Sequence, residues 1–529
     1  MLRSGSKTLI AFAVFVTCLA VYILVSSGHH YSIDGIVMFQ YAKSLWFDHS
    51  LKLNPPIKWA GFDFVIPYWS IGLSLAYTPL VAILSKTVFE SDLSIRRIPE
   101  PTAPNYSEQL LHDHLYQYCS LLNALNTALS AAILYLICIE FGFSNRRAAA
   151  TALTFGLFSP ATVYAKLDFA QPLASLCLLA SVLFLLKART SRVAGLVFTG
   201  ISIGLTILAR SEFMILTPIF ALSVCLMPRG SSYPNANRSV DILKGLLAFG
   251  LPVGALLLVN QAITFLKFGS WLSGYPLAYY LIVEPKHWTT AFFANLISPG
   301  RGILLFCPIS ILSLAGMKKS VQINRWFAMT LTASVLEIFL FYPIWRAWDG
   351  GLSWGPRFLI PIVPYLCFFA YAALPRVRSG RHIFALAALL TFQILVTMQG
   401  ALFNYLEFYG SLGLSSAQLD RQLYHFSIIM SPLFSGWRNL FHPSNYDIRW
   451  FSVGSGHRLE TLIPSFALIC LVGLSKGWLD FFRTSPTAEI SRIYRNAATL
   501  DAAKSAGRQV RASEQGSTGS PYIDRDQLG

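Results

Sequence analysis

Long apolar segments recur along almost the whole chain, each close to the length that a helix needs to cross a bilayer. A membrane span takes roughly 17 to 25 residues, and about twelve segments approach that length. They lie at 8–27, 118–141, 148–164, 169–186, 193–209, 211–227, 243–265, 303–316, 326–345, 358–375, 383–404 and 459–475. Hydrophobic residues make up 54% of the 529 positions and charged residues only 12%. The sequence therefore predicts an all-α polytopic membrane protein with about twelve transmembrane helices.

The net charge of +16 comes from short basic clusters between these segments. If the N-terminus is cytoplasmic, every predicted inner connection carries lysine or arginine, as the positive-inside rule requires. These residues are Arg3, Lys7, Arg146, Arg147, Lys187, Arg189, Arg192, Arg229, Arg238, Lys244, Lys318, Lys319, Arg325, Arg376, Arg378 and Arg381. We interpret the basic balance as membrane topology, with both termini cytoplasmic, rather than as a nucleic-acid-binding surface. Residues 8–27 could instead be a cleaved signal peptide, but its removal would leave an odd number of spans.

This topology divides the chain into four parts. Residues 1–405 form a transmembrane module whose large first loop, 28–117, is extracytoplasmic. Residues 406–458 form a small extracytoplasmic segment that could recognise an acceptor. A last span at 459–475 leads to a polar tail at 476–529, which is predicted to be cytoplasmic and largely disordered.

The first extracytoplasmic loop is long enough to be functional rather than a passive connector. Asp34 lies at its start, and a carboxylate at a membrane rim usually has a partner or a task. The alternative is a solvated helix cap. Residues 36–46 approximate an amphipathic helix in the interface plane, with Gln40, Lys43 and Asp48 expected to face water.

A second polar block follows the ninth span. Residues 345–357 contain three tryptophans, three glycines and the charged residues Arg346, Asp349 and Arg357. Glycines let a backbone approach a ligand, and arginine offers a planar fork for phosphate oxygens. An aromatic belt with snorkelling arginines would explain the tryptophans but not the glycines. Other charged candidates on the same predicted side are Lys166, Asp168, Arg210, Glu212 and Arg301.

Several sequence motifs, taken in order, carry a resemblance to a known superfamily. They are DGIVMFQYAKSLWFDHSLKL after the first span, then YWSIGLSLAYTPL, YAKLDFAQPLA, LARSEFMILTP, FGSWLSGY, SPGRGILLFCP and WDGGLSWGPRFLIPIVP. In this order the chain resembles the GT-C membrane glycosyltransferases over most of residues 8–405. The group that it resembles most contains the bacterial relatives of protein O-mannosyltransferases and of the lipid A aminoarabinose transferase.

The resemblance implies transfer of a sugar, with inversion, from a polyprenyl-phosphate donor to an extracytoplasmic acceptor, which could be a glycan, a lipid or a protein. It makes Asp34 the candidate catalytic base. Family members often carry two adjacent acids at this point, whereas here Gly35 follows, and Asp168 could supply a second acid from another loop. The candidate substrate-binding residues are Lys43, Asp168, Arg210, Arg301, Arg346, Asp349 and Arg357.

The chemistry suits these residues. Inverting transfer needs a base near the acceptor hydroxyl, cations for the departing phosphate and positioning of both substrates. Residues 68–89 are interpreted as a juxtamembrane or re-entrant segment that forms a wall for the lipid chain. We expect no cofactor, since arginine and lysine can neutralise phosphate; a divalent metal near His29 and His30 is the alternative.

Two other functions are also compatible with the sequence. One is a secondary transporter or flippase of a lipid-linked sugar, although no half-to-half repeat is evident. The other is a non-catalytic relative that only binds a glycolipid. For all three functions we expect a multi-pass protein of the bacterial inner (plasma) membrane.

Overall fold

The computed structural model describes residues 6–59, 62–88, 106–228, 238–271, 285–345, 347–374, 380–411, 425–434, 437, 441–442, 445–449 and 458–483. Residues Gly5–Leu474 form one compact unit, and Met1–Ser4 with Ser475–Gly529 form another. The helices and strands up to residue 474 belong to the first unit. The predicted tail at 476–529 lies outside the described residues from 484 onward.

Helices account for nearly every segment that was predicted to span the membrane. Among the described residues, seven helices are long and apolar enough to cross a bilayer. They are α1 (Lys7–Leu24), α6 (Leu121–Phe141), α10 (Arg192–Ala209), α12 (Arg238–Phe268), α17 (Arg325–Phe341) with η7 (Tyr342–Ile344), α19 (Gly380–Leu402) and most of α23 (Arg458–Arg483). The predicted all-α polytopic fold is confirmed.

The other predicted spans are shorter or broken. Three shorter apolar helices are α9 (Gln171–Lys187), η4 (Ser211–Leu216) with α11 (Thr217–Leu226), and η8 (Arg357–Ile362) with α18 (Val363–Ala373). Two segments are interrupted, giving α7 (Asn145–Phe158) with α8 (Pro160–Tyr164), and α15 (Ile303–Phe306), η6 (Pro308–Leu312) and α16 (Ser313–Ile323). Pro160 follows the end of α7, and Pro308 follows the end of α15. A proline has no backbone N–H and cannot continue the hydrogen-bond ladder of the preceding helix.

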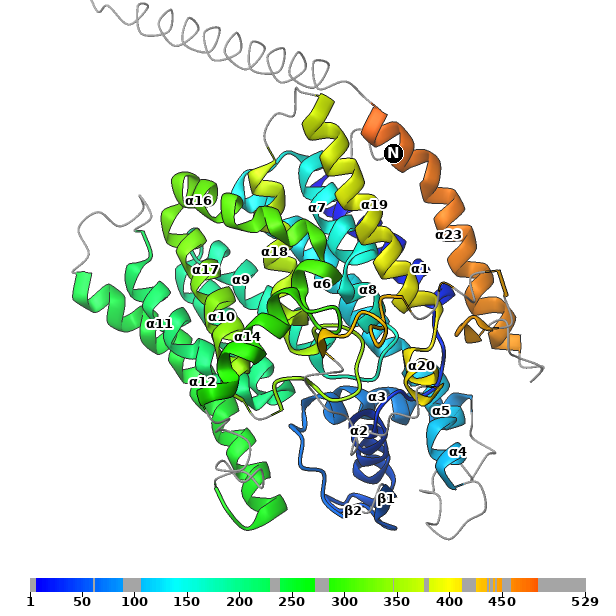
Figure 1. Ribbon diagram of the computed structural model, residues 1–529. Helices are drawn as coiled ribbons and strands as arrows, with labels where there is room; N and C mark the ends of the chain where they lie inside the picture. The colour runs from blue at the N-terminus through cyan, green and yellow to red at the C-terminus, as the bar shows by residue number, and fades with distance from the viewer. Residues whose placement is uncertain are drawn as a thin grey trace, which may run out of the picture. The chain divides into compact units, whose positions relative to one another are not determined.

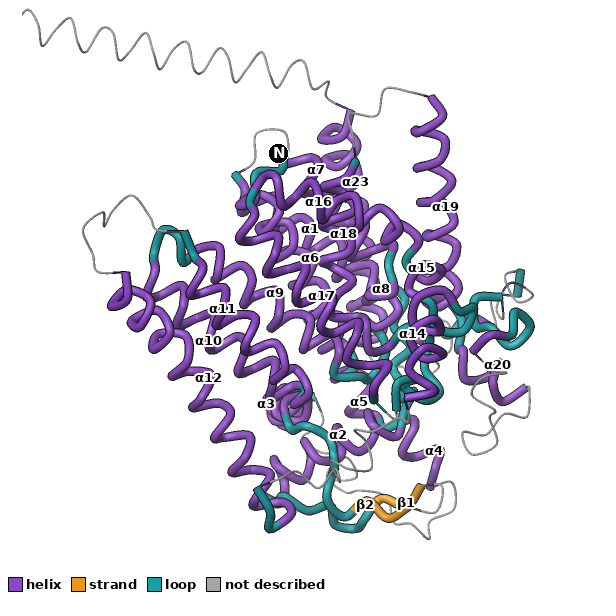
Figure 2. Tube along the Cα trace, turned by 60° about the vertical axis from the view of Figure 1, so that its left-hand side comes forward, coloured by secondary structure: helices purple, strands orange, loops and turns teal. Residues whose placement is uncertain are grey.

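The first loop folds into a compact group of short elements. They are α2 (Ile33–Lys43), η2 (Ser44–Asp48), β1 (Ile57–Trp59), β2 (Phe62–Phe64), α3 (Gly72–Thr87), α4 (Tyr106–Leu111) and α5 (His114–Cys119). The strands β1 and β2 pair antiparallel, with Ile57 opposite Phe64. Figures 1 and 2 both show this group at one end of the helices, while α7 and α16 lie toward the other end. Further elements are η5 (Pro285–His287), α14 (Trp288–Ile297) and α20 (Tyr405–Ser411).

The helix α2 is buried almost all round, which corrects one prediction. Gln40 is fully buried and Lys43 is 2% exposed, so neither faces water as expected. The amide of Gln40 and the ammonium of Lys43 both donate to Asp113 Oδ2, at 3.1 and 2.9 Å. Asp48, in the next turn, is exposed as predicted. A periodicity argument could not find this partner, because Asp113 lies 70 residues away from Lys43.

The segment that was interpreted as juxtamembrane is the helix α3, which is not among the helices long and apolar enough to span. It packs against α2 and α5. A Cβ on Gly72 would lie 2.5 Å from the carbonyl oxygen of Leu208, so the start of α3 meets the end of α10 directly. This contact holds the first-loop group against the transmembrane helices.

Candidate active site

Asp34 forms an ion pair with Arg357, the first residue of η8, which lies 323 residues further along the chain. Ser32 caps α2, since its Oγ accepts a hydrogen bond from the Gly35 amide at 2.9 Å. Asp34 therefore lies in the first helical turn, where the partial positive charge of the helix end favours a carboxylate. The Asp34 side chain is 17% exposed and that of Arg357 is 12% exposed. Both side chains are therefore largely shielded from bulk water.

The guanidinium of Arg357 is positioned by more than its carboxylate partner. Its central carbon lies 3.8 Å from the centre of the Phe169 ring, within the range of a cation–π contact. Its Nη1 donates to the carbonyl oxygen of Gly350 at 3.3 Å. Gly350 has a φ of +68°, a left-handed conformation that glycine adopts without a steric cost. Gly350 thus presents its carbonyl oxygen to Arg357 and helps to position the guanidinium.

Gln171 links Arg357 to a second arginine. In the amide orientation that satisfies its neighbours, Gln171 Oε1 accepts from Arg357 Nε at 3.2 Å and from Arg210 Nη1. Arg210 also pairs with Glu212, whose Oε1 accepts from the Tyr342 hydroxyl at 3.2 Å. Arg210 and Glu212 are both charged candidates from the sequence, and the structure pairs them with one another. Two guanidinium groups therefore share one amide oxygen at the same rim.

Asp168 is completely buried and contacts the segment just before α2. Its Oδ2 accepts from His30 Nδ1 and the Tyr31 amide, both at 3.0 Å, and from the Ser32 amide at 3.2 Å. Its Oδ1 accepts from the Ser32 hydroxyl at 2.9 Å. Burial lowers the pKa of His30 despite the Asp168 carboxylate, so the ring is neutral at pH 7 and donates through Nδ1. The structure thus brings Asp168 to the Asp34 helix, a proximity that the sequence alone could not establish.

The turn that carries Asp168 is hydrogen-bonded to the membrane helix α6. The buried amide of Asn123, near the start of α6, donates to the carbonyl oxygen of Leu167 at 2.7 Å and to that of Phe169 at 2.9 Å. These two bonds bracket Asp168. Sequence reasoning missed Asn123; the indication was an amide in an otherwise apolar span, where polar groups usually have partners.

A second buried cluster joins the first loop to the segment 445–449. Asp447 accepts hydrogen bonds from His29 Nε2 at 2.8 Å, from Lys166 Nζ at 2.9 Å and from the hydroxyl of Tyr31. Burial disfavours the charged His29 ring, but Asp447 outweighs it and raises the pKa of His29. At Asp447 burial favours the neutral acid, but Lys166 and then His29 outweigh it and hold the pKa of the carboxyl below its usual range.

Arg449 adds to the same attachment. Its amide donates to the Ser26 carbonyl oxygen at 2.8 Å, and its guanidinium donates to the carbonyl and side chain of Gln117 at 3.0 and 3.1 Å. Sequence reasoning missed both Asp447 and Arg449. They stand in a polar stretch where nothing local distinguishes them from solvated residues.

The remaining candidates have the following places. Arg301 is 1% exposed and donates to Ser353 Oγ and to the carbonyl oxygens of Gly351 and Gly355. Asp349 lies 3.8 Å from Nε2 of His425. Arg346 lies outside the described residues. Lys43 pairs with Asp113, and that pairing outweighs burial to lower the pKa of the Asp113 carboxyl. Of the predicted substrate-binding residues, Arg357 and Arg210 have the most direct connection to Asp34.

Among the residues that the structure describes, no three His, Cys, Asp or Glu side chains are grouped closely enough to hold a metal ion. His29 and His30 are adjacent in sequence, but they bind different carboxylates. His29 contacts Asp447 and His30 contacts Asp168.

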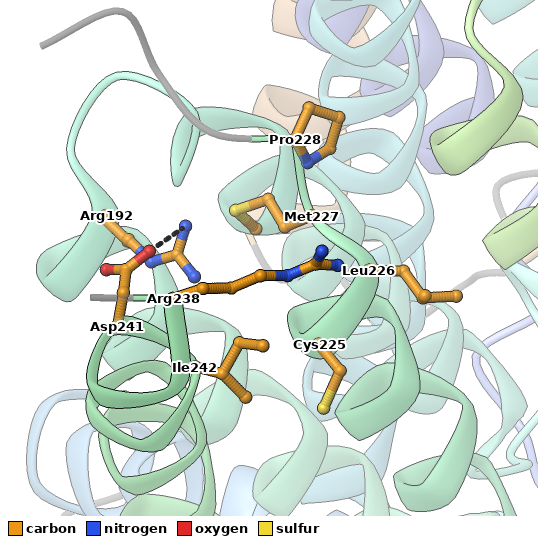
Figure 3. A pocket seen from close by; sticks show the side chains of 8 residues that line it. All are labelled: Arg192, Cys225, Leu226, Met227, Pro228, Arg238, Asp241 and Ile242. Atoms are coloured by element: carbon orange, nitrogen blue, oxygen red, sulfur yellow. Dashed lines mark ion pairs between the residues drawn. The ribbon is translucent and has the colours of Figure 1, made fainter. Parts of the chain in front are cut away.

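A cavity of about 320 Å³ lies at the other end of α10, away from Asp34. Figure 3 shows Arg192 and Asp241 paired among its lining residues, with Nη1 and Oδ2 3.4 Å apart. Cys225, Leu226, Met227, Pro228, Arg238 and Ile242 complete its lining. Arg192 begins α10 and Arg210 follows its end, so helix geometry separates the two ends by about 27 Å. The cavity is not part of the Asp34 site.

No protein-family model matches the chain, and no curated protein matches it in sequence. Three solved structures are similar in fold. ArnT from Cupriavidus metallidurans in the apo state is 13% identical with a TM-score of 0.47, over 79% of this chain and 67% of that chain. The same protein bound to undecaprenyl phosphate is 14% identical with a TM-score of 0.43, over 80% and 74%. The oligosaccharyltransferase AglB from Archaeoglobus fulgidus, in complex with an inhibitory peptide and a dolichol-phosphate, is 12% identical with a TM-score of 0.45, over 80% and 60%. Similarity at this level concerns the course of the chain, and the chemistry has to come from the site's own residues.

Proposed function

We propose that the protein is a membrane glycosyltransferase that moves a sugar from a polyprenyl-phosphate donor to an acceptor hydroxyl on the extracytoplasmic side, with inversion. The observation that carries the proposal is the pair formed by Asp34 and Arg357. A carboxylate that can accept a proton and a guanidinium that can hold a phosphate are in direct contact, both partly shielded from water. Transfer of a sugar from a lipid phosphate needs these two functions side by side.

Asp34 acts as the general base in this mechanism. As the acceptor oxygen forms its bond to the anomeric carbon, the hydroxyl proton passes to the Asp34 carboxylate. The bond between that carbon and the phosphate oxygen breaks, and the polyprenyl phosphate leaves on the opposite face of the sugar. Attack from one face and departure from the other invert the configuration.

Arg357 and Arg210 stabilise the departing phosphate. Both are joined through Gln171, and a planar guanidinium matches phosphate oxygens well. Asp34 occupies one side of Arg357 in the structure. A donor phosphate competes with Asp34 for that guanidinium, and its binding releases the carboxylate to accept a proton. Phosphate neutralised by two arginines needs no metal ion, so we propose a cofactor-independent reaction.

The location of the charges favours transfer over transport. Asp34, Arg210 and Arg357 stand at the ends of helices, since Asp34 is in the first turn of α2, Arg210 follows α10 and Arg357 begins η8. Transporters of lipid-linked sugars need polar groups near the middle of the membrane, along the path of the moving headgroup. We further propose a bacterial plasma membrane location, with these helix ends facing away from the cytoplasm.

The Asp34→Asn variant tests this proposal in full-length protein in lipid nanodiscs. Transfer from undecaprenyl phosphate carrying a radiolabelled hexose or pentose should fall by about 10² to 10⁴-fold, the usual contribution of a general base. Binding of undecaprenyl phosphate should persist. Asp241→Asn, which alters an ion pair at the far end of α10, is the matched control and should transfer normally.

Three outcomes would contradict the proposal. Full transfer by Asp34→Asn removes this carboxylate from the mechanism. Movement of the labelled lipid across proteoliposomes without transfer indicates a transporter. Lipid binding with neither transfer nor movement by the unaltered protein indicates a non-catalytic glycolipid-binding protein.

A further inference from the structure

The residue after Asp34 has no room for a side chain. A Cβ placed on Gly35 would lie 2.0 Å from Oδ2 of Asp168, 2.1 Å from its Cγ and 2.4 Å from its Cβ. The Asp168 carboxylate thus occupies the volume in which a side chain at position 35 would begin. The absence of a second acid after Asp34 has a physical cause, because another carboxylate already stands there.

Asp168 has no free oxygen with which to serve a substrate. It is completely buried, and four donors from residues 30–32 use both of its oxygens. A buried carboxylate with this many hydrogen bonds fixes the groups that donate to it, since each donor that is released loses its partner in a site shielded from water.

The fixed groups define how α2 begins. The Ser32 hydroxyl donates to Asp168 Oδ1 and accepts from the Gly35 amide, so it relays the position of Asp168 to the first helical turn. Asp34 lies in that turn. On the other side, Asn123 anchors the turn at 167–169 to α6. A continuous set of hydrogen bonds therefore runs from a membrane helix through Asp168 to the residues that flank Asp34.

We propose that Asp168 is a positioning residue, which sets the orientation of Asp34 toward Arg357 through Ser32 and the 31–32 backbone without contacting either substrate. This role rests on the proposed function, and it replaces the substrate-binding role that the sequence suggested for Asp168. Loss of the carboxylate leaves Asp34 chemically intact but misplaced.

The test compares Asp168→Asn with Ser32→Ala, Asp34→Asn and the control Asp241→Asn, all as full-length protein in nanodiscs. Hydrogen exchange reads the amides of Tyr31, Ser32 and Gly35. In Asp168→Asn their protection should fall at least about tenfold, since one carboxylate oxygen becomes an NH₂ group, which cannot accept the bonds that were made to that oxygen. Ser32→Ala keeps the three hydrogen bonds to Asp168 Oδ2 and should lower the exchange protection mainly of the Gly35 amide. This variant therefore provides an exchange measurement even if Asp168→Asn fails to fold.

The kinetic readout separates positioning from substrate contact. With an undecaprenyl-phosphate hexose as donor, Asp168→Asn should lower kcat about 10- to 100-fold, the scale of an ångström-sized misplacement, with the donor KM and the binding of undecaprenyl phosphate unchanged. A loss of donor affinity that matches the loss of kcat overturns the proposal, because Asp168 would then contact the substrate. Unchanged exchange at residues 31, 32 and 35 overturns it as well.

A paired substitution separates the carboxylate from the space that it fills. Gly35→Ala alone should unfold or strongly destabilise the first turn of α2. Gly35→Ala with Asp168→Gly removes the overlap and should recover part of the thermal stability that Gly35→Ala loses, but not kcat. Recovery of both would overturn the proposal. If the unaltered protein transfers no sugar but exchange at residues 31, 32 and 35 responds as expected, the proposed function fails while the positioning of this turn by Asp168 stands.

Discussion

Oδ1 of Asp447 lies 2.8 Å from Nε2 of His29, a residue 418 positions earlier in the chain. This bond and the one from the Tyr31 hydroxyl tie the segment 445–449 to the start of the first loop, and the bond from Lys166 ties it to the turn that carries Asp168. The same loop continues into Ser32 and α2. A segment that the sequence assigned to acceptor recognition is therefore attached three residues before the cap of the helix that carries Asp34.

The bond between His29 and Asp447 should make stability depend on pH. The pKa of His29 is raised in the folded protein, so its contribution is complete below the ordinary value of about 6.5 and is lost as pH rises through the higher folded value. Asp447 stays ionised in this window because its pKa is lowered. We expect the melting temperature in nanodiscs to fall as the pH rises above about 6.5, by the equivalent of about 1–2 kcal/mol in total.

The control is His29→Asn, which should flatten that slope. His30 acts in the other direction and in another window, since its lowered pKa costs stability only as pH falls below about 6.5. An unaltered slope above pH 6.5 in His29→Asn would rule out this pair as the cause.

Replacement of Arg357 should distinguish charge from geometry. Arg357→Lys keeps the charge but loses the planar contacts with Phe169, Gln171 and Asp34. We expect donor turnover to fall about 10²- to 10³-fold in both Arg357→Lys and Arg357→Gln. Turnover and KM of an undecaprenyl-phosphate sugar provide the measurement. Near-normal activity in Arg357→Lys would show that a point charge suffices.

Two glycines of the loop after η7 should respond differently to alanine. Gly351 has a φ of +66°, and a Cβ there would meet no heavy atom of the described residues within 4 Å, so Gly351→Ala should cost only about 1–2 kcal/mol of backbone strain. Gly355 has a φ of +62°, and its Cβ would lie 2.5 Å from the buried Phe306 ring. Gly355→Ala should cost about 1–3 kcal/mol more. Thermal unfolding of both variants gives the comparison; equal losses would contradict it.

Lys43 permits a test of its predicted phosphate contact. Lys43→Met should destabilise the protein by about 3–5 kcal/mol, because it leaves the buried Asp113 carboxylate without its cation. Lys43→Met with Asp113→Asn should recover most of that stability. Affinity of the double variant for undecaprenyl phosphate then decides the role: normal binding shows that Lys43 is structural, and a tenfold or greater loss supports the phosphate contact.

The helical fold could be predicted because each span is set by local composition. Segment length and the basic clusters were enough to place Asp34, Asp168, Arg210 and Arg357 on one predicted side, and the structure brings loops from that side into contact. The pairing of Asp34 with Arg357 depends on how helices pack, and no local pattern encodes it. The sequence therefore identified both residues without showing that they touch.

Burial was the property that sequence patterns predicted least well. The polar residues Gln40 and Lys43 were expected to lie on a solvent-exposed helix face, but both are buried and donate hydrogen bonds to Asp113. Asp447 and Arg449 could not be distinguished from solvated residues in the sequence, because their partners, His29 and Gln117, lie in a distant loop. A buried charge is recognisable only when its partner is known, and both partners here come from tertiary folding.

The overlap between Gly35 and Asp168 constrains how this site can change during evolution. The two positions share one small volume, so a homologue with a side chain directly after its first acid needs a smaller residue where Asp168 stands. Positions 35 and 168 should therefore vary together, with a large side chain at no more than one of the two positions. A collection of related sequences in which both positions carry large side chains would require a different backbone at the start of α2.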